Sequence, residues 1–128
     1  MKRRPLPGSR DAVVARDRAA QRAERAQAPR QDVSHARAAA LRAMLDTDDS
    51  AASDSQADRM LRAMRETGRV TTFEARTFLD VCEPTARIHH LRHQRGLPVL
   101  LTWVRQVSAA GKLHRVGCYV LARGDGPQ

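Results

Sequence analysis

The most basic segment of the chain lies between Glu83 and Gly96 and reads EPTARIHHLRHQRG. It holds three arginines and three histidines but only two large aliphatic residues, Ile88 and Leu91. Histidine can donate and accept hydrogen bonds or bind a metal, and arginine binds phosphates and base edges in a planar geometry. These residue types therefore indicate a metal site, a solvated helix or a surface that binds nucleic acid.

The metal site is the most specific chemical alternative. His89 and His93 are spaced to place two imidazoles on one face of a helix, and Cys82 or His90 could add a ligand. The chain has no CxxC pair, no HExxH and no glycine-rich phosphate loop, and the histidine-bearing helix has no carboxylate to orient a ligand or act as a base. We therefore expect no cofactor and no enzymatic activity, and keep a zinc-dependent enzyme only as an alternative.

The charge distribution favours an anionic partner. The 128 residues include 23 Lys and Arg against 14 Asp and Glu, for a net charge of +9, and only two of the basic residues are lysines. Between residues 84 and 124 there are seven basic residues and no Asp or Glu, whereas a merely solvated face normally mixes signs. A general arginine bias of the genome is the alternative explanation of this charge.

The cysteines and the N-terminal sequence indicate the cellular compartment of the protein. Cys82 and Cys118 stand far apart, which argues against a disulfide framework. No continuous apolar run follows the basic N-terminus, and no stretch approaches transmembrane length. We expect a soluble, cytoplasmic, nucleoid-associated protein without membrane contact.

The first part of the chain, residues 1–52, is predicted to be a basic extension that is partly helical or disordered. Alanine and arginine dominate residues 11–28, where a helix could form with little to pack against. A second helix is predicted over 34–45, with an apolar stripe. The extension is either a mobile basic arm that makes sequence-independent contacts or a packing surface in an oligomer such as a homodimer, although no heptad repeat supports a coiled coil.

The second part, residues 53–124, has sharper helical signals. A helix capped by serine is predicted over 55–67, ending at a glycine. Residues 71–74 (TTFE) match the S/T-x-x-E capping box and open a second helix. After a tight turn over 80–83, a proline in the first position opens a third helix, predicted over 84–95. We expect residues 53–124 to fold as an independent unit.

The remaining pattern alternates with a period of two. Strands are predicted over 98–107 and 113–121, joined by a hairpin-like loop at 108–111. Pairing Val107 with Lys112 would gather six apolar side chains on one face and set basic residues at the tip. Those six are Val99, Leu101, Trp103, Val116, Cys118 and Val120. In that arrangement the tryptophan is a core residue rather than a base-stacking one.

Three short helices followed by a hairpin is the order of a winged helix-turn-helix. The motifs GRVTTFEA, ARIHHLR and HRVGCYVL, within roughly residues 56–122, resemble the small winged helix-turn-helix domain of bacterial phage and prophage proteins. One departure is the turn DVCE, which lacks the glycine often found there. The predicted fold is mainly α with a C-terminal β-hairpin: a winged helix-turn-helix preceded by an Ala/Arg-rich helical extension. The resemblance implies DNA binding.

The third helix and the hairpin tip form the predicted DNA-binding surface. Ile88 and Leu91 give the helix a narrow inward stripe, which leaves its other side for a partner. Outward side chains are expected to read base edges. Basic side chains at the borders of the helix and on the wing, residues 105–115, are expected to contact phosphates. The base-reading candidates are Thr85, Ala86, His89, His90 and His93. The phosphate-contact candidates are Arg87, Arg92, Arg105, Lys112, His114 and Arg115.

Double-stranded DNA is therefore the expected partner, and a phage-type transcriptional or replication-control factor is the expected function. Two alternatives stay open. The domain could bind RNA or another anionic partner, or it could be a protein-interaction module that kept the fold and lost DNA binding.

Overall fold

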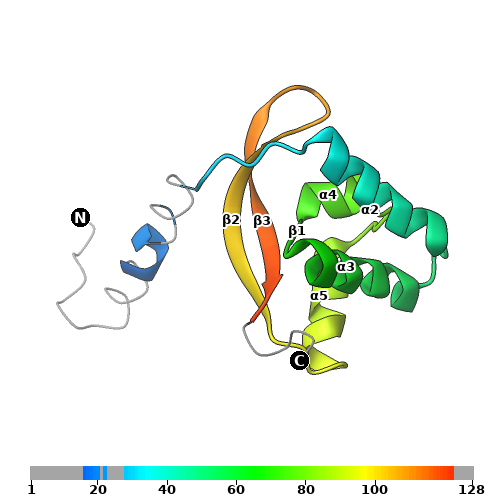
Figure 1. Cartoon of the computed structure of the whole chain (residues 1–128). Coiled ribbons are helices and arrows are strands. Elements are labelled where there is room, and N and C mark those ends of the chain that lie inside the picture. Colours follow the sequence, from blue (N-terminus) through cyan, green and yellow to red (C-terminus); the bar gives the residue numbers. More distant parts are fainter. Residues whose placement is uncertain (1–15, 21, 23–27, 123–128) are drawn as a thin grey trace.

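The computed structural model describes residues 16–20, 22 and 28–122. In order, the elements are α2 (His35–Thr47), α3 (Ser53–Thr67), β1 (Val70–Thr71), α4 (Thr72–Phe78), α5 (Pro84–His93), β2 (Val99–Val107) and β3 (Leu113–Leu121). The helices pack on one side of the long β2–β3 hairpin (Figure 1). The order of the helices and the hairpin is the one predicted from the sequence, whereas β1 was not predicted. Of the helix predicted over 11–28, residues 16–20 and 22 are helical, and most of the others lie outside the described residues.

Local signals set most of the helix ends, but the serine cap predicted for α3 is absent, because this helix begins at Ser53 after Ala52, with no side-chain cap hydrogen bond. The Thr71 hydroxyl accepts a hydrogen bond from the Glu74 amide at 3.1 Å, and the Glu74 carboxylate accepts one from the Thr71 amide at 2.9 Å, which confirms the capping box. Gly68 ends α3 with a left-handed φ of 88°, a conformation that glycine adopts without steric cost. Pro84 begins α5 as predicted, although this helix ends at His93, two residues early.

The hydrophobic core extends across the predicted domain boundary. Leu41 and Met44 of α2 are buried in the same cluster as Met60 of α3 and Leu91 of α5. The helix before residue 53 therefore supplies core side chains to the helix-turn-helix. Independent folding of residues 53–124 stays a prediction, and such a fragment would have to fold without these two side chains.

The hairpin register differs from the predicted one by one residue. Val107 pairs with Leu113 rather than with Lys112, and Val104 pairs with Val116. The six apolar residues expected on one face are consequently divided between two. Val99, Leu101 and Trp103 share a face with Leu121, Tyr119 and Gly117, and the opposite face carries Val116, Cys118 and Val120. β3 also pairs with β1, which gives a sheet of order β1-β3-β2.

The longer loop accounts for the shift. It comprises residues 108–112, and the Ser108 amide donates to the Lys112 carbonyl at 2.7 Å. The Gly111 amide donates back to the Ser108 carbonyl at 2.9 Å. Gly111 has a φ of 80°, in the left-handed region that favours glycine. The loop therefore closes around this glycine with five residues instead of four.

A buried polar side chain explains which face of β2 turns inward. Gln106 is 2% exposed, and its side-chain oxygen accepts a hydrogen bond from the Thr71 hydroxyl at 2.6 Å. Near the tip, Val104 on the same face is also buried, but the pattern reverses at the start of β2, where Leu100 on this face is 53% exposed and Val99 on the other face is buried. Trp103, expected in the core, is only half-buried. The prediction assigned the inward face of β2 from its apolar residues alone. It failed because that face also carries the polar Gln106.

The Glu74 carboxylate connects four elements. It receives hydrogen bonds from Arg37 of α2 at 2.6 and 2.9 Å, and from the Gln106 side chain of β2 at 3.3 Å, in addition to the amide of Thr71 in β1. Burial raises the pKa of this carboxyl, but the hydrogen bond from Arg37, the Thr71 amide and the positive charge of Arg37 outweigh burial, so the pKa lies below 4.5. Glu74 is therefore a buried, ionised group on which α2, α4, β1 and the wing converge.

We expect the stability conferred by Glu74 to depend on pH. Because its pKa is lower in the folded state than in the unfolded state, the contribution is present above pH 4.5 and is lost as the pH falls through the lower, folded-state pKa. Urea unfolding at several pH values should show a steeper loss of unfolding free energy toward acid for the parent protein than for Glu74→Gln. Glu66→Gln, at an exposed α3 ion pair, is the control. Identical acid dependence in the parent and the Glu74 variant would contradict this assignment.

Candidate nucleic-acid interface

Helix α5 is held against the core by a narrow stripe and by contacts to α3. Ile88 and Leu91 are 1% and 0% exposed. Toward the C-terminal end, Arg95 forms an ion pair with Asp58 of α3. Its guanidinium also donates to the backbone carbonyl of Asp54 at 3.3 Å. These contacts fix the rotation of α5, and with it the side chains that face outward.

Four of the five predicted base-reading residues lie exposed on α5: Thr85, Ala86, His89 and His93. The His89 and His93 rings lie side by side, with centroids 4.2 Å apart. Two of these residues are small, so a partner could approach the backbone of the first turn closely. The histidines one and two turns later supply hydrogen-bond donors and acceptors.

His90 lies elsewhere, which corrects its predicted position. Its side chain is 18% exposed, and Nε2 lies 3.4 Å from an Asp54 oxygen at the start of α3. One residue corresponds to about 100° around the helix axis, so His90 is turned from His89 toward α3. A shallow groove lies between the two helices here, and its lining also includes two of the outward candidates, Ala86 and His89, beside Ser53, Asp54, Arg87, His90 and Gln94. Because Asp54 would repel phosphate, the α3 side of α5 is less suited to a DNA strand than the wing side.

Two of the arginines predicted to contact phosphate also have roles within the protein. The Nε of Arg92 donates to the Val99 carbonyl at 2.9 Å, which ties α5 to the start of β2. The Nε of Arg105 donates to the Ala28 carbonyl at 2.8 Å. A third, Arg87, is half-buried, with its Nε enclosed and without a hydrogen-bond partner among the described residues.

The remaining predicted phosphate contacts lie at the hairpin tip. Lys112, His114 and Arg115 are exposed. Arg115 pairs with Arg105 across the strands, where the sequence predicted His114. The ring of His114 packs edge-on against Phe73 of α4, with centroids 5.7 Å apart. The wing tip is therefore basic, and the ring contact links it to α4, the helix that precedes the turn.

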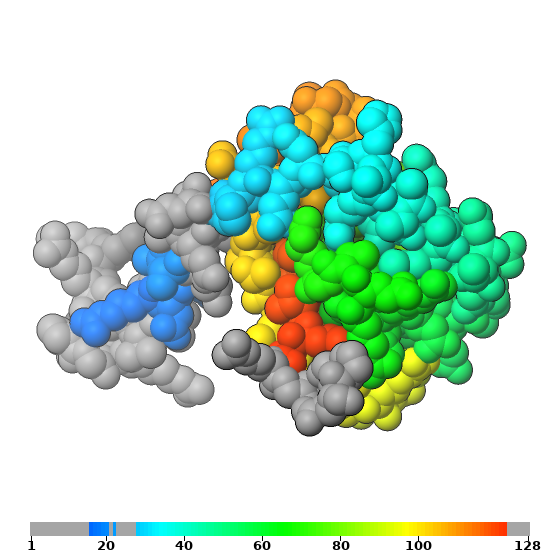
Figure 2. All heavy atoms as spheres, in the orientation of Figure 1, coloured from blue at the N-terminus to red at the C-terminus, as the bar shows by residue number. Residues whose placement is uncertain are grey.

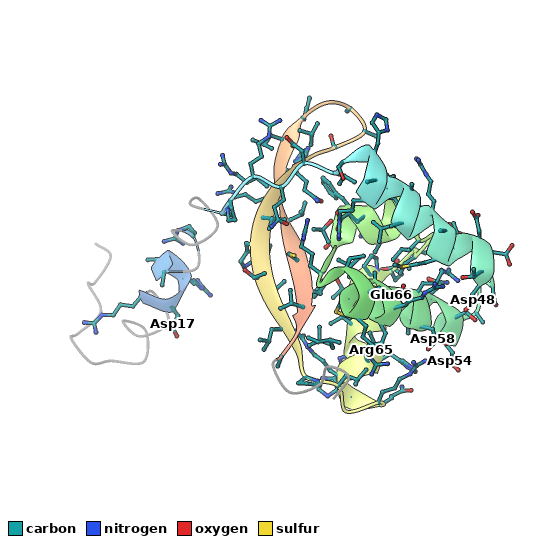
Figure 3. All side chains as sticks on the ribbon, in the orientation of Figure 1. Asp17, Asp48, Asp54, Asp58, Arg65 and Glu66 are labelled. Carbon is teal, nitrogen blue, oxygen red and sulfur yellow. The ribbon has the colours of Figure 1, made fainter. Side chains whose placement is uncertain are left out.

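Acidic side chains collect at the other end of the molecule. Asp48, Asp54 and Asp58 lie around the α2–α3 end, away from the hairpin tip (Figure 3). Residues 84–122, in contrast, contain no Asp or Glu. The wing is therefore well separated from these carboxylates, whereas the acidic end borders one side of α5, where Asp54 lies near His90 and Asp58 pairs with Arg95.

Sequence reasoning missed the residue that holds the helix-turn-helix turn. Arg59 of α3 is 2% exposed, and its guanidinium donates to four backbone carbonyls. Its guanidinium donates to the carbonyls of Leu79 at 2.6 Å and Asp80 at 3.3 Å in the turn before α5. It also donates to Asp48 at 3.0 Å and Ser50 at 2.8 Å in the α2–α3 loop.

Arg59 also explains how the turn forms without glycine. Asp80 adopts a φ of 52°, a left-handed conformation that Asp tolerates better than most residues. The guanidinium binds the carbonyls of this residue and the one before it, which stabilises the turn. The sequence signal for this role was the position of Arg59 next to the apolar stripe of α3.

The metal alternative finds no support in this part of the chain. Within residues 16–20, 22 and 28–122, no three His, Cys, Asp or Glu side chains come together in a way that could hold a metal ion. Cys82, the proposed extra ligand, is an exposed free thiol, and Cys118 is a buried one. Burial raises the pKa of the Cys118 thiol, which is consistent with a core residue.

Comparison with known proteins identifies the class. The family model described as "winged helix-turn-helix domain" matches residues 55–124, more than half of the chain. The protein belongs to this winged helix-turn-helix family, which confirms the predicted fold class and indicates nucleic-acid binding. No curated protein and no solved structure matches the chain. Among the described residues, no helix combines the length and apolar character required to cross a bilayer.

Replacement of Arg59 should test how the turn is held. We expect Arg59→Met, which keeps the bulk but leaves four carbonyls without their donor, to lower the free energy of unfolding by about 3 kcal/mol. Arg62→Met, at an exposed position of the same helix, breaks only the ion pair with Glu66 and an exposed hydrogen bond to Thr47, and it should cost about 1 kcal/mol. Chemical denaturation measures both. Equal losses would mean that Arg59 does not hold the turn.

Proposed function

We propose that this protein binds double-stranded DNA in a sequence-dependent manner and acts as a phage-type transcriptional or replication-control factor. Helix α5 enters the major groove, and the tip of the β2–β3 wing contacts the phosphate backbone. The observation that carries the proposal is the exposed face of α5, where small residues and two histidines stand outward, together with a wing that has no acidic residue. The protein works inside the cell, at the nucleoid.

The residue types on this face of α5 suit recognition of base sequence rather than non-specific electrostatic attraction to DNA. The major groove admits an α-helix, and Ala86 allows close approach or contact with a thymine methyl group. Neutral His89 and His93 each keep one donor and one acceptor, so they can bond to base edges without carrying charge. Lys112 and Arg115, at the wing tip, supply the phosphate contacts that set register.

We further propose that the role is not enzymatic. The sequence has none of the metal-protease, CxxC or glycine-rich phosphate-loop motifs that would indicate catalysis. A DNA-binding factor needs only the groove-facing helix and the phosphate contacts, and these account for the exposed basic residues of α5 and the wing.

A second candidate function is favoured by one observation. Leu101, Val107 and Leu113 are 45%, 41% and 42% exposed, and all three belong to the same face of the hairpin. An exposed apolar strip of this kind is typical of protein contacts. A protein-interaction module on the same fold would use this strip, and its binding would not depend on the outward residues of α5.

Selection of bound duplexes from a random pool tests the proposed function directly. A domain that reads sequence should enrich duplexes that share a short motif. Competitor RNA should displace these duplexes from the protein poorly. Two half-sites in inverted order, one helical turn apart, would indicate a homodimer, whereas a single half-site would indicate a monomer. Recovery of no motif, together with weak binding at low salt, would favour the interaction module.

The outward histidines and the wing cations should affect binding differently. We expect His89→Ala or His93→Ala to lose about 1 to 3 kcal/mol on the selected duplex and little on a scrambled duplex, because base contacts confer specificity. Lys112→Ala or Arg115→Ala should weaken binding to both duplexes and lower the salt slope by about one. Paired titrations of the two duplexes measure these effects.

The outward histidines have a close control on the same helix. His90→Ala changes a histidine that faces Asp54, and it should leave the ratio of the two affinities unchanged. If His89→Ala and His93→Ala weaken both duplexes equally, these residues contribute only general attraction. If no variant changes either affinity, α5 is not the reading helix.

A further inference from the structure

A pocket lies between the wing loop, α4 and the segment that leads into α2. Its volume is about 580 Å³, within the range of sites that bind small organic molecules. The segment before α2 contributes residues 30–33 and is tied to β2, because the Gln31 amide donates to the Arg105 carbonyl at 2.9 Å. This segment crosses the hairpin in Figure 1, and its cyan atoms lie against the hairpin in Figure 2. Three parts of the chain that are distant in sequence therefore bound the pocket.

The walls of the pocket are mainly apolar and aromatic. Phe73 and Phe78 of α4 both line it. Other side chains hold the two rings: His114 packs edge-on against Phe73, and the Arg42 guanidinium lies 4.9 Å from the centre of the Phe78 ring. The remaining apolar lining residues are Val33, Val107 and Ala109. Because aromatic rings pack well against one another in offset or edge-to-face contact, these walls favour a ligand with a flat apolar body.

Two buried polar residues also line the pocket. Glu74 and Gln106 are 1% and 2% exposed. The Glu74 charge is balanced by Arg37, and four hydrogen bonds occupy its two oxygens, so it has no unpaired charge to attract a cation. Gln106 donates one side-chain amide proton to Glu74 at 3.3 Å, and no other described residue accepts from this amide. The second amide proton therefore remains for an oxygen of a ligand.

The exposed charges around the pocket favour an anion. Arg30 donates to both carboxylate oxygens of Asp32, at 3.0 and 3.2 Å, so these two charges offset each other. Arg76 is exposed and forms no ion pair among the described residues. Beside it stands Thr77, whose hydroxyl can donate to an anion. One positive charge at the rim is therefore unmatched.

We propose that this pocket binds a small aromatic carboxylate, with its ring against Phe73 and Phe78 and its carboxylate at Arg76, and that the bound acid fixes the wing against α4. Residues 107–109 of the wing and 73–78 of α4 both line the site, so an occupant contacts both. Binding of the acid is independent of the proposed function, whereas its effect on DNA rests on that function. An acid that fixes the wing raises the affinity for DNA, and DNA raises the affinity for the acid by the same factor.

The first experiment measures binding of 2-naphthoate to the full-length protein by calorimetry. The cation 2-naphthylmethylammonium carries a similar ring, and we expect it to bind about tenfold more weakly, because Arg76 repels it. Arg76→Gln should weaken 2-naphthoate about fivefold and leave the neutral 2-naphthylmethanol unchanged. Arg62→Gln, which removes the same charge from an exposed position on α3, is the control and should bind 2-naphthoate as the parent does.

A second experiment uses two neighbouring alanines of the wing loop. Ala109 lines the pocket, whereas Ala110 is equally exposed but is not a lining residue. Ala109→Trp should block 2-naphthoate binding, and Ala110→Trp should retain it. In the parent, saturating 2-naphthoate should slow hydrogen exchange of the Ser108 and Gly111 amides, which close the loop, and should raise the affinity for the selected duplex severalfold. Neither effect should occur with Ala109→Trp.

The outcomes separate the site from the proposed function. If 2-naphthoate binds with these preferences but the parent selects no duplex, the proposed function fails and the site stands. If the parent binds the acid no better than the cation, or if the two tryptophan variants bind it equally, the site is overturned. Binding without slower exchange in the wing loop would overturn the effect on the wing. If 2-naphthoate does not bind and Ala109→Trp lowers the sedimentation coefficient, the pocket instead receives a second copy of the chain.

Discussion

The relative placement of the helices and the wing depends on the ion pair and hydrogen bonds of the buried Glu74 carboxylate. A buried charge is stable only when it is paired and hydrogen-bonded, and Glu74 draws its partners from α2, β1 and β2. The residue that caps α4 locally therefore also joins two distant parts of the chain, α2 and β2. This dual role explains why α2, which precedes the family match at residues 55–124, shares the core with it.

Arg59 makes a second set of buried contacts, at the C-terminal end of α4 where the turn to α5 begins. Its guanidinium satisfies carbonyls in the α2–α3 loop and in the turn before α5, so the loop and the turn are fixed to the same side chain. Glu74 holds the wing side of the domain and Arg59 holds the turn that presents α5. The proposed DNA-binding surface requires close positioning, and these two buried charged residues provide that support.

The parts of the fold that depend on neighbouring residues could be predicted from the sequence. The Thr71 capping box, Gly68 after α3 and Pro84 at the start of α5 each act within one helical turn, and the structure confirms all three. The hairpin register could not be predicted from apolar spacing, because the inward face of β2 includes the polar Gln106, whose partners lie far away in sequence. The same limit applies to His90 and Arg105, since Asp54 and Ala28 are distant in the chain.

The central claim, that α5 and the wing tip bind duplex DNA, is tested most directly by mapping backbone amide chemical shifts during titration with the selected duplex. The account predicts that perturbations concentrate at residues 85–93 of α5 and 108–115 of the wing, and that the acidic α2–α3 end at residues 46–58 is little changed. Perturbations centred on that acidic end, or on the exposed apolar strip without any change in α5, would contradict it.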